Sequence, residues 1–548
     1  MAYGYASSQP GLGVWLILAA GLIERMIIAF WLNPGFDEAY YFLYTLHPAL
    51  SYFDHPPLVA WITALGPWLL GGAVSGFSIR LGSVLLYTGS LFWLYQTGRQ
   101  LFGRRAGFFT LVIASIIPIF QVGFGVLTLP DSPLLFFWTA ALSGAAAEFF
   151  PRRSGLPSSF SESGSYQPTW RLALISGWVG LACLGKYHGF GLGFGLVLFC
   201  ALTPRFRPAL ASFWTLLGVG LFGLALSPIL LWNGQHDWIS LRFQSGRAVP
   251  ASGFSALACL GAWGMGVGFL FPSLGIPLWW VTGRALLAGC LRPLRALRPT
   301  DTQLKQGLIL SICLPVVLGF TLMGGYRQVL PTWPMPGFWG ITLLLGYQAD
   351  RWWDRWAGGV RRWLMASAVM VTCLLSLGLL HVSAGILQKP NSYPWEGVWA
   401  IADDPSTQLI DIEQLRAGFS QDPVLANALQ SADFVITNHY FLAGQVAMAL
   451  TPISQKPITC FSPDPRGFAF WSQPQQWLGQ NALYITSRLF QDRPESDPLP
   501  PYANYFERVE PIGEIPLRRA GEIVQTFLVY QATYLQHPYL WPTELPTA

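Results

Sequence analysis

Long apolar segments recur along the chain as far as residue 386, and short polar loops separate them. A helix that crosses a bilayer needs about 20 predominantly apolar residues. Candidate segments lie at 11–32, 79–98, 106–126, 131–149, 172–185, 188–203, 209–231, 257–283, 307–325, 332–349 and 363–386. These eleven segments predict a mainly α-helical protein that crosses the membrane many times.

Two of these segments, 172–185 and 188–203, are short and leave two arrangements open. If they formed one bent helix, every later segment would be reversed. Short cytoplasmic loops are enriched in Arg and Lys. With eleven spans and a cytoplasmic N-terminus, the inner loops carry Arg99, Arg104, Arg105, Arg152, Arg153, Arg205, Arg207, Arg284, Arg292, Arg295, Arg298, Lys305, Arg351, Arg355, Arg361 and Arg362. The outer segments carry fewer basic residues, so we predict eleven spans in the cell (inner) membrane and an extracytoplasmic C-terminal region.

The composition changes at about Gln388, where long apolar runs stop and Pro, Asp, Gln and Ser increase. Short β-branched and aromatic runs predict strands at 434–437, 458–461, 482–486 and 523–530, with a helix at 442–450. This alternation predicts a small α/β domain. We therefore predict two domains, a transmembrane domain (1–387) whose first outer loop is 33–78, and an extracytoplasmic α/β domain (388–548). The second domain has no Gly-rich phosphate loop. We assign it no catalytic residue and expect it to cover an outer cavity or to help select an acceptor.

The composition supports a membrane protein and argues against other classes. Hydrophobic residues make up 52% of the chain and charged residues 11%, whereas soluble domains carry about 25% charged residues. The net charge of +5 is not gathered in a basic cluster among aromatics, so we expect no nucleic-acid partner. Six of the seven cysteines lie in apolar segments, which argues against a disulfide or zinc framework. The first apolar segment is predicted to be a retained span, not a cleaved signal peptide.

Polar residues gather at the predicted outer face, which suggests a site there. They are Asp37, Glu38, Asp54, His55, Asp131, Lys186, His188, His236 and Asp237. Asp37 and Glu38 are adjacent carboxylates just past the first span. Partial desolvation there raises a carboxyl pKa and suits the group to act as a general base. The alternative for Asp37 is a helix N-cap, and the alternative for the whole set is ordinary solvated loops.

Several motifs in a fixed order carry a resemblance to a known family. They are FDEAYY at 36–41, YFDHPPLVAW at 52–61, RQLFGRRAG at 99–107, TLPDSPLLFFW at 128–138, LGKYHGF at 184–190 and LLWNGQHDWISLRFQ at 230–244. In these motifs the chain resembles GT-C glycosyltransferases of the bacterial group related to protein O-mannosyltransferases and lipid A aminoarabinose transferases. The resemblance covers roughly the first 250 residues.

The resemblance implies a GT-C helical bundle and an inverting sugar transfer at the outer face of the membrane. The implied donor is a sugar on a polyprenyl phosphate, and the acceptor is a lipid, a glycan or a protein. By similarity, Asp37 is the catalytic base, Glu38 supports it, and Asp131 matches a second acidic position.

The leaving phosphate gains negative charge during transfer, so it needs cations nearby. The candidates are Lys186, His55, Arg25 and Arg242. His55 stands where the aminoarabinose transferases have a phosphate-facing lysine, and Asp54 stands where they have a glutamate. For Lys186 the alternative is a snorkelling side chain, and for Arg25 it is snorkelling or pairing with Glu24.

Asp54 and His236 are candidate ligands of a divalent metal, as a carboxylate and a histidine are in some relatives. The sequence shows no full ligand set, and a hydrogen-bonded loop histidine is the favoured interpretation of His236. We predict no required cofactor. Two other functional classes stay open, a transporter or lipid flippase and an inactive receptor-like relative. A transporter would place polar residues near the midplane, often in repeats, and an inactive relative would be expected to lose the pair Asp37–Glu38.

Overall fold

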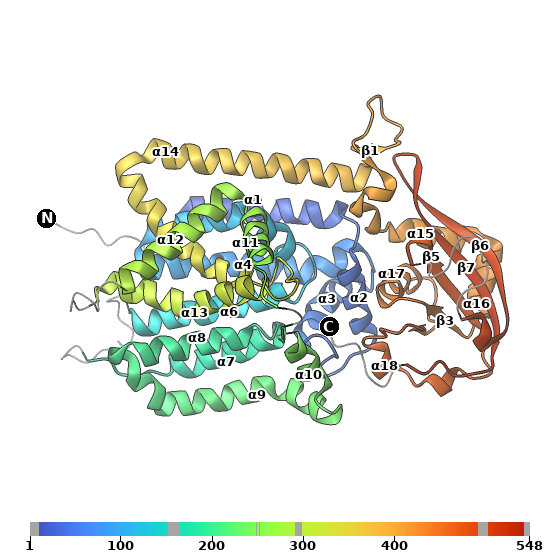
Figure 1. Cartoon of the computed structure of the whole chain (residues 1–548), viewed down its shortest axis with the longest axis horizontal. Helices are drawn as coiled ribbons and strands as arrows, with labels where there is room; N and C mark the ends of the chain where they lie inside the picture. The colour runs from blue at the N-terminus through green and yellow to red at the C-terminus, as the bar shows by residue number, and fades with distance from the viewer. Residues whose placement is uncertain are drawn as a thin grey trace.

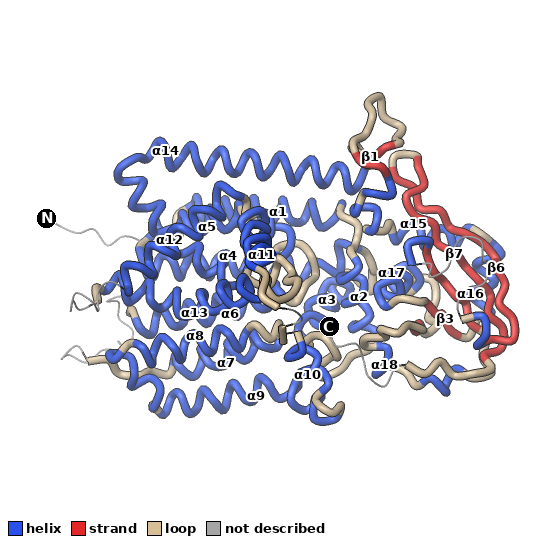
Figure 2. Tube along the Cα trace, viewed as in Figure 1, coloured by secondary structure: helices blue, strands red, loops and turns tan. Residues whose placement is uncertain are grey.

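The computed structural model of the chain describes residues 10–151, 165–247, 249–250, 253–290, 299–490 and 502–541. Among the residues used to predict the orientation, Arg152, Arg153, Arg292, Arg295 and Arg298 lie outside these ranges. The chain forms a helical bundle joined at one end to a small domain built on a β-sheet (Figures 1 and 2).

The bundle is built from long apolar helices, as the hydrophobic pattern predicted. They are α1 (Leu12–Trp31), α4 (Gly76–Phe102), α5 (Arg104–Ile116), α6 (Asp131–Phe149), α7 (Arg171–Gly185), α8 (Gly189–Leu202), α9 (Phe213–Gln235), α11 (Ala256–Phe269), α12 (Pro272–Cys290), α13 (Asp301–Met323) and α14 (Met335–Ala384). In the described part of the chain, α1, α4, α9, α13 and α14 are each long and apolar enough to cross a membrane. The total of eleven spans stays a prediction.

Two predicted segments and one predicted loop differ from the structure observed. The segment 257–283 is two helices, α11 and α12, bent by 117° at a short break where Phe271 has a φ of +67° and Pro272 begins α12. The segment 106–126 is interrupted at Ile117 and continues as a π-helix over Ile119–Phe124, because Pro118 disfavours the helical conformation of the residue before it. The predicted loop between the last two segments is helical, since α14 continues through it with one break at Trp356.

The short segments that left two arrangements open form a tight helical hairpin, α7 and α8, and not one bent helix. A Cβ atom on Gly189 would lie 2.5 Å from the backbone nitrogen of Cys183, so the chain reverses at a position that only glycine fits. Farther along, Gly193 of α8 approaches Val179 of α7. The two helices are therefore antiparallel, and Lys186 lies in the turn between them.

Two short helices follow α1 in the first loop, α2 (Phe36–Leu46) and α3 (Leu58–Leu69), and α10 (Ile239–Gly246) follows α9. They lie at the end of the bundle next to the sheet domain (Figure 1). Gly35 precedes α2, and its N–H donates to the Glu38 carboxylate at 3.0 Å. Asp37 therefore lies inside the first turn of α2 and is not its N-cap.

The C-terminal domain contains a mixed five-stranded sheet in the order β4-β3-β5-β7-β6. Its strands are β3 (Phe434–Thr437), β4 (Ile458–Cys460), β5 (Ala482–Ser487), β6 (Phe506–Arg519) and β7 (Glu522–Leu535), and β1 (Gln388–Lys389) pairs separately with β2 (Trp399–Ala400). All four predicted strands are confirmed, and so is the helix α17 (Tyr440–Leu450). The remaining helices are α15 (Ile412–Gln421), α16 (Pro423–Ser431) and α18 (Phe468–Trp471).

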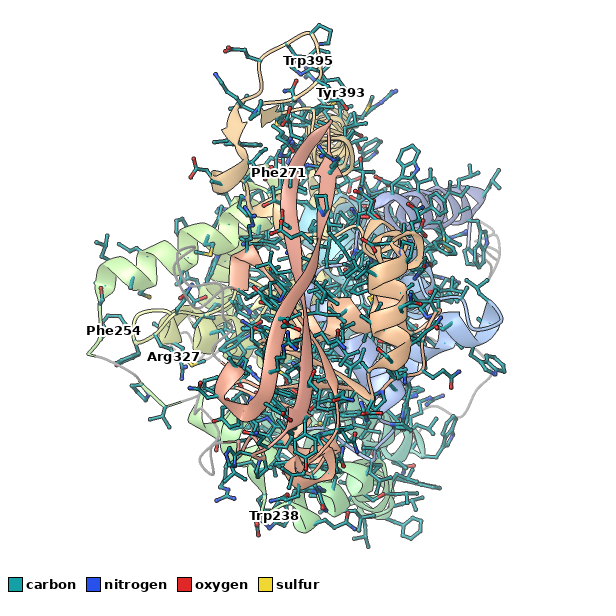
Figure 3. The ribbon with its side chains drawn as sticks, turned by 90° about the vertical axis from the view of Figure 1, so that its right-hand side faces the viewer. Trp238, Phe254, Phe271, Arg327, Tyr393 and Trp395 are labelled. Atoms are coloured by element: carbon teal, nitrogen blue, oxygen red, sulfur yellow. The ribbon has the colours of Figure 1, made fainter. Side chains whose placement is uncertain are left out.

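Several contacts tie the domain to the bundle, including the following two. Helix α17 crosses α2 so closely that a Cβ atom on Gly444 would lie 2.5 Å from the backbone of Ala39. Near the end of α14, the buried carboxylate of Asp404 binds both Arg519, at 2.5 Å, and His381, at 3.1 Å. Figure 3 shows the domain end-on, with the long strands β6 and β7 crossing its centre and Tyr393 and Trp395 on a loop at its edge.

Candidate active site

A cavity of about 880 Å³ lies where the bundle meets the C-terminal domain. Its polar lining includes Asp37, Tyr40, Tyr41, Asp54, His55, Asp131, Lys186, Tyr187, Gln244, Arg247, Tyr440 and Arg466. Its apolar lining includes Pro315, Val316, Gly319, Phe320 and Met323 of α13. The cavity therefore offers charged groups beside an apolar wall, which suits a ligand with a polar head and a hydrocarbon tail.

Asp37 faces this cavity with a carboxyl group that is ready to accept a proton. Among the described residues, none donates a hydrogen bond to its side chain, although solvent reaches it through the cavity. Enclosure by the protein, together with the negative charges of Asp54 and Glu38, raises the pKa of Asp37 to about 6. Arg466 and Lys186 oppose this shift. A carboxyl group with a pKa near 6 is a good general base at neutral pH because it is mostly ionised and still binds a proton well.

Glu38, the neighbouring carboxylate, is buried and accepts four hydrogen bonds. Arg80 donates to both of its oxygens, at 2.7 and 2.6 Å, and the backbone N–H groups of Thr128 and Gly35 each donate at 3.0 Å. Arg80 also donates to backbone carbonyls at the end of α1, among them Ala29 at 3.1 Å. This bidentate pair anchors the first turn of α2 to α1 and α4. Glu38 therefore fixes the turn of α2 that carries Asp37, and its supporting role in catalysis stays a prediction.

The second motif of the first loop places Asp54 and His55 on the cavity wall. Asp54 is buried and accepts hydrogen bonds from the hydroxyl groups of Tyr40, at 3.3 Å, and Tyr44. The Nε2 atom of His55 lies 3.0 Å from the hydroxyl oxygen of Tyr41. Burial lowers the pKa of His55 to about 4, so the ring is neutral at physiological pH. His55 therefore carries no charge there and could contact a phosphate only as a neutral donor.

Lys186 and Asp131, which are far apart in the sequence, form an ion pair on the cavity wall. The Nζ atom of Lys186 lies 2.9 Å from both carboxylate oxygens of Asp131. The Lys186 side chain is only 12% exposed, so it is not a snorkelling side chain that reaches into bulk water. The pair leaves Lys186 on the cavity surface with a fixed position, and Asp131 is less free than Asp37 to act as a base.

Two arginines that we did not propose as site residues also line the cavity, Arg247 and Arg466. Arg247 follows α10, and the guanidinium group of Arg327 holds its backbone carbonyl at 2.8 Å (Arg327 is labelled in Figure 3). Arg466 comes from the loop after β4, so the C-terminal domain contributes a charged side chain to the cavity wall. That domain also supplies Tyr440 and Phe441 to the cavity wall.

The structure places three other candidates away from the cavity lining. Arg25 is buried in the bundle, where it donates to Thr88 at 3.0 Å and lies over the ring of Tyr87. Arg242 is exposed on α10. His236 contacts the carbonyl oxygen of Trp232 at 2.7 Å, as expected for a hydrogen-bonded loop histidine. None of these three residues therefore lines the cavity as a phosphate or metal ligand.

A metal site built from Asp54 and His236 finds no support in this arrangement, because the two side chains bind different partners. Within the described ranges, no group of three His, Cys, Asp or Glu side chains is arranged to hold a metal ion.

Comparison with known proteins finds similarity to named glycosyltransferases. A family model described as dolichyl-phosphate-mannose-protein mannosyltransferase matches residues 54–147, a range that includes Asp54, His55 and Asp131. The lipid A galacturonosyltransferase RgtD of Rhizobium johnstonii is 24% identical over 339 residues, which are 61% of this chain and 65% of that protein. The undecaprenyl phosphate-α-4-amino-4-deoxy-L-arabinose arabinosyl transferase of Erwinia tasmaniensis is 28% identical over 162 residues, 29% of this chain and 24% of that protein. The chain thus spans less than two thirds of either relative.

The fold extends the similarity over nearly the whole chain. The crystal structure of ArnT from Cupriavidus metallidurans in the apo state superposes with a TM-score of 0.58 at 15% identity, covering 94% of this chain and 97% of that one. The structure of ArnT bound to undecaprenyl phosphate gives a TM-score of 0.55 over the same shares. The resemblance predicted from the sequence is therefore confirmed, and the chain has the GT-C fold with a C-terminal sheet domain.

Proposed function

We propose that this protein is an integral membrane glycosyltransferase that moves a sugar from a polyprenyl-phosphate donor to a lipid, glycan or protein acceptor, with inversion. The observation that carries the proposal is one cavity whose lining combines Lys186, Arg247 and the carboxyl group of Asp37, which no described residue hydrogen-bonds, with an apolar wall. Named relatives are a lipid A galacturonosyltransferase and an arabinosyl transferase. The division at residues 387 and 388 into a transferase domain and a soluble domain is part of this proposal.

The proposed reaction uses the cavity residues in distinct roles. The acceptor hydroxyl or amine attacks the anomeric carbon while Asp37 takes its proton. The bond between the anomeric carbon and the phosphate oxygen breaks, and the phosphodiester leaves as a phosphomonoester with one more negative charge. Lys186, held by Asp131, and Arg247 stabilise that charge. The polyprenyl chain lies against the apolar wall formed by α13.

We also propose that the protein lies in the cell (inner) membrane with the cavity and the C-terminal domain outside the cytoplasm. Two basic regions support this orientation. Arg105, at the start of α5, pairs with Asp350 and Asp354 of α14, so the α4–α5 turn and the basic bend of α14 lie together. The bend lies at the end of the bundle opposite the sheet domain (Figure 1). Basic residues favour the cytoplasmic side.

The transporter or flippase alternative predicts polar residues on a path through the middle of the bundle. The charged residues of the cavity instead come from the end of the bundle next to the C-terminal domain and from that domain itself. This one-sided arrangement favours a reaction at a surface over passage across the membrane.

The proposed function is tested with membranes from a source strain that lacks the gene. Mass spectrometry of its glycolipids and glycoproteins is expected to show loss of one sugar and accumulation of the matching polyprenyl-phosphate sugar. Purified wild-type protein added to these membranes should restore the product, and the Asp37→Asn variant should not. Unchanged glycolipids and glycoproteins, together with no binding of undecaprenyl phosphate by the purified protein, would refute the proposal.

A further inference from the structure

The C-terminal domain inserts one cation, Arg466, into the cavity through a sharply bent turn. Arg466 has a φ of +50°, a left-handed conformation that is unfavourable for a non-glycine residue. The next residue, Gly467, donates its backbone N–H to the hydroxyl oxygen of Tyr40 at 3.1 Å. The turn is thus held in this conformation against α2, the helix that carries Asp37.

The guanidinium group of Arg466 is fixed in position, but some of its N–H donors lack an acceptor among the described residues. Its Nε atom donates to Asp464 at 3.0 Å, and the group lies over the rings of Tyr440, at 4.9 Å, and Phe243, at 5.2 Å. Its Nη1 atom is 3.7 Å from Asp54, which is too long for a hydrogen bond. Within the described residues, neither terminal nitrogen of Arg466 has a hydrogen-bond acceptor. Those nitrogens form a planar fork that matches the geometry of a carboxylate or a phosphate.

The guanidinium group of Arg247 adds a second positive charge close to Arg466. Arg247 lies over the same Phe243 ring at 4.5 Å, and in the described part of the chain no carboxylate lies within 4 Å of it. Asp54, the nearest acid to Arg466 in the cavity, already accepts from Tyr40 and Tyr44. Two arginines beside one ring repel each other, so an added anion would stabilise the arrangement.

We infer that the terminal nitrogens of Arg466 bind an oxyanion of the acceptor, so that the acceptor carries a phosphate or carboxylate group near its attacking hydroxyl or amine. This inference rests on the proposed function. The donor phosphate is tied to a membrane-embedded chain and lies on the bundle side, where Lys186 comes from the turn between α7 and α8. Arg466 enters from the C-terminal domain, which is the side from which an acceptor arrives. Arg466 is therefore a specificity-determining residue.

The test uses full-length protein in nanodiscs, saturated with undecaprenyl phosphate so that the donor-phosphate position is filled. Glucose 6-phosphate and glucose serve as soluble probes, and ligand-detected NMR titration measures their binding. Wild-type protein should bind glucose 6-phosphate at least about tenfold more tightly than glucose, as a charge-assisted bidentate contact requires. Arg466→Gln should abolish that preference, and Arg466→Lys should keep part of it because the charge remains. The affinity for undecaprenyl phosphate, measured separately, should change less than about twofold in both variants, because another residue holds the donor phosphate.

Arg242→Gln is the matched control, because it removes an exposed arginine of α10 that lies outside the cavity lining. It should leave both affinities unchanged. The inference is overturned if wild-type protein shows no preference for glucose 6-phosphate, or if Arg466→Gln keeps the preference. It is also overturned if Arg466→Gln weakens undecaprenyl phosphate binding instead, because the residue would then serve the donor. If Arg466→Gln does not fold, the Arg466→Lys variant alone tests the inference. Lysine keeps the charge but lacks the bidentate fork, so this variant should bind glucose 6-phosphate more weakly than the wild type. Failure of wild-type protein to bind undecaprenyl phosphate would count against the proposed function and not against this inference alone.

Discussion

Replacing Asp37 with asparagine removes the proposed base while keeping the size and shape of the side chain. Because no described residue donates a hydrogen bond to the Asp37 carboxyl group, the amide breaks no existing contact. A positioned general base contributes about 10²–10⁴-fold to the rate. We therefore expect kcat to fall by about this factor, while the affinity for undecaprenyl phosphate stays close to that of the wild type.

The pH dependence supplies a second, independent signature. The pKa of Asp37 is raised to about 6, and only the ionised carboxylate can accept a proton. Wild-type activity should therefore rise by about tenfold between pH 5 and pH 7 and then level off. The residual activity of the Asp37→Asn variant should lack this rise, because its amide does not titrate in that range.

The Asp37 carboxyl group should lower the free energy of unfolding as the pH rises, whereas activity should increase over the same pH range. A carboxyl pKa raised in the folded protein means that the folded state disfavours the ionised form. The resulting destabilisation is absent below the unfolded pKa, near 4, grows as the pH rises to about 6, and is complete above it. Asp37→Asn should thus unfold at the same temperature as wild type at pH 4, and at the same or a higher temperature at pH 8.

The assay supplies membranes from the gene-deleted strain as donor and acceptor, and product is quantified by mass spectrometry at each pH. Glu38→Gln is the informative comparison, because it should lower the unfolding temperature whereas Asp37→Asn should not. The reasoning about Asp37 is wrong if Asp37→Asn retains more than about a tenth of wild-type activity at pH 7. It is also wrong if the variant shows the same rise in activity between pH 5 and pH 7.

Three further predictions follow from other contacts. Lys186→Ala should weaken undecaprenyl phosphate binding and slow transfer, whereas Lys186→Arg should keep part of both; normal affinity and rate in the alanine variant would assign the donor phosphate to Arg247. Arg80→Gln should destabilise the protein by about 3–5 kcal/mol in thermal or denaturant unfolding, because it leaves Glu38 buried without its cation; a loss below about 1 kcal/mol would contradict this view of the pair. A reporter active only outside the cytoplasm and fused after Ala548 should give signal, whereas signal only from a cytoplasmic reporter would reverse the proposed orientation.

Local patterns in the sequence were enough to predict most helices and the strands of the sheet centre. Runs such as Phe434–Thr437 are β-branched and aromatic and are buried on both faces, so their composition identifies them. Strand β6 was not predicted, because it contains Pro511 and Pro516, and proline usually argues against a strand. It forms the edge of the sheet, where proline is tolerated because its missing N–H leaves no partner unpaired.

The pairing of charges was not predictable in the same way. Asp37 and Glu38 stood out because they are adjacent, but the partner of Glu38, Arg80, lies 42 residues away on α4. Lys186 and Asp131 are 55 residues apart. Arg466 belongs to a polar loop whose composition resembles that of any surface turn. Such contacts are fixed by how helices and domains pack, and periodicity along one segment carries no information about that packing.

The division of roles between Asp37 and Glu38 shows how packing gives two identical groups different chemistry. Successive residues of a helix point about 100° apart, so one carboxylate of α2 turns toward the bundle and the other toward the cavity. Glu38 accepts hydrogen bonds from four donors, whereas Asp37 accepts none from the described residues and burial raises its pKa to about 6. Arg80 holds α2 from the bundle, and Gly467 holds it from the C-terminal domain through Tyr40. The position of Asp37 therefore depends on both parts of the chain, and we propose that the C-terminal domain supports catalysis in this way as well as by binding the acceptor.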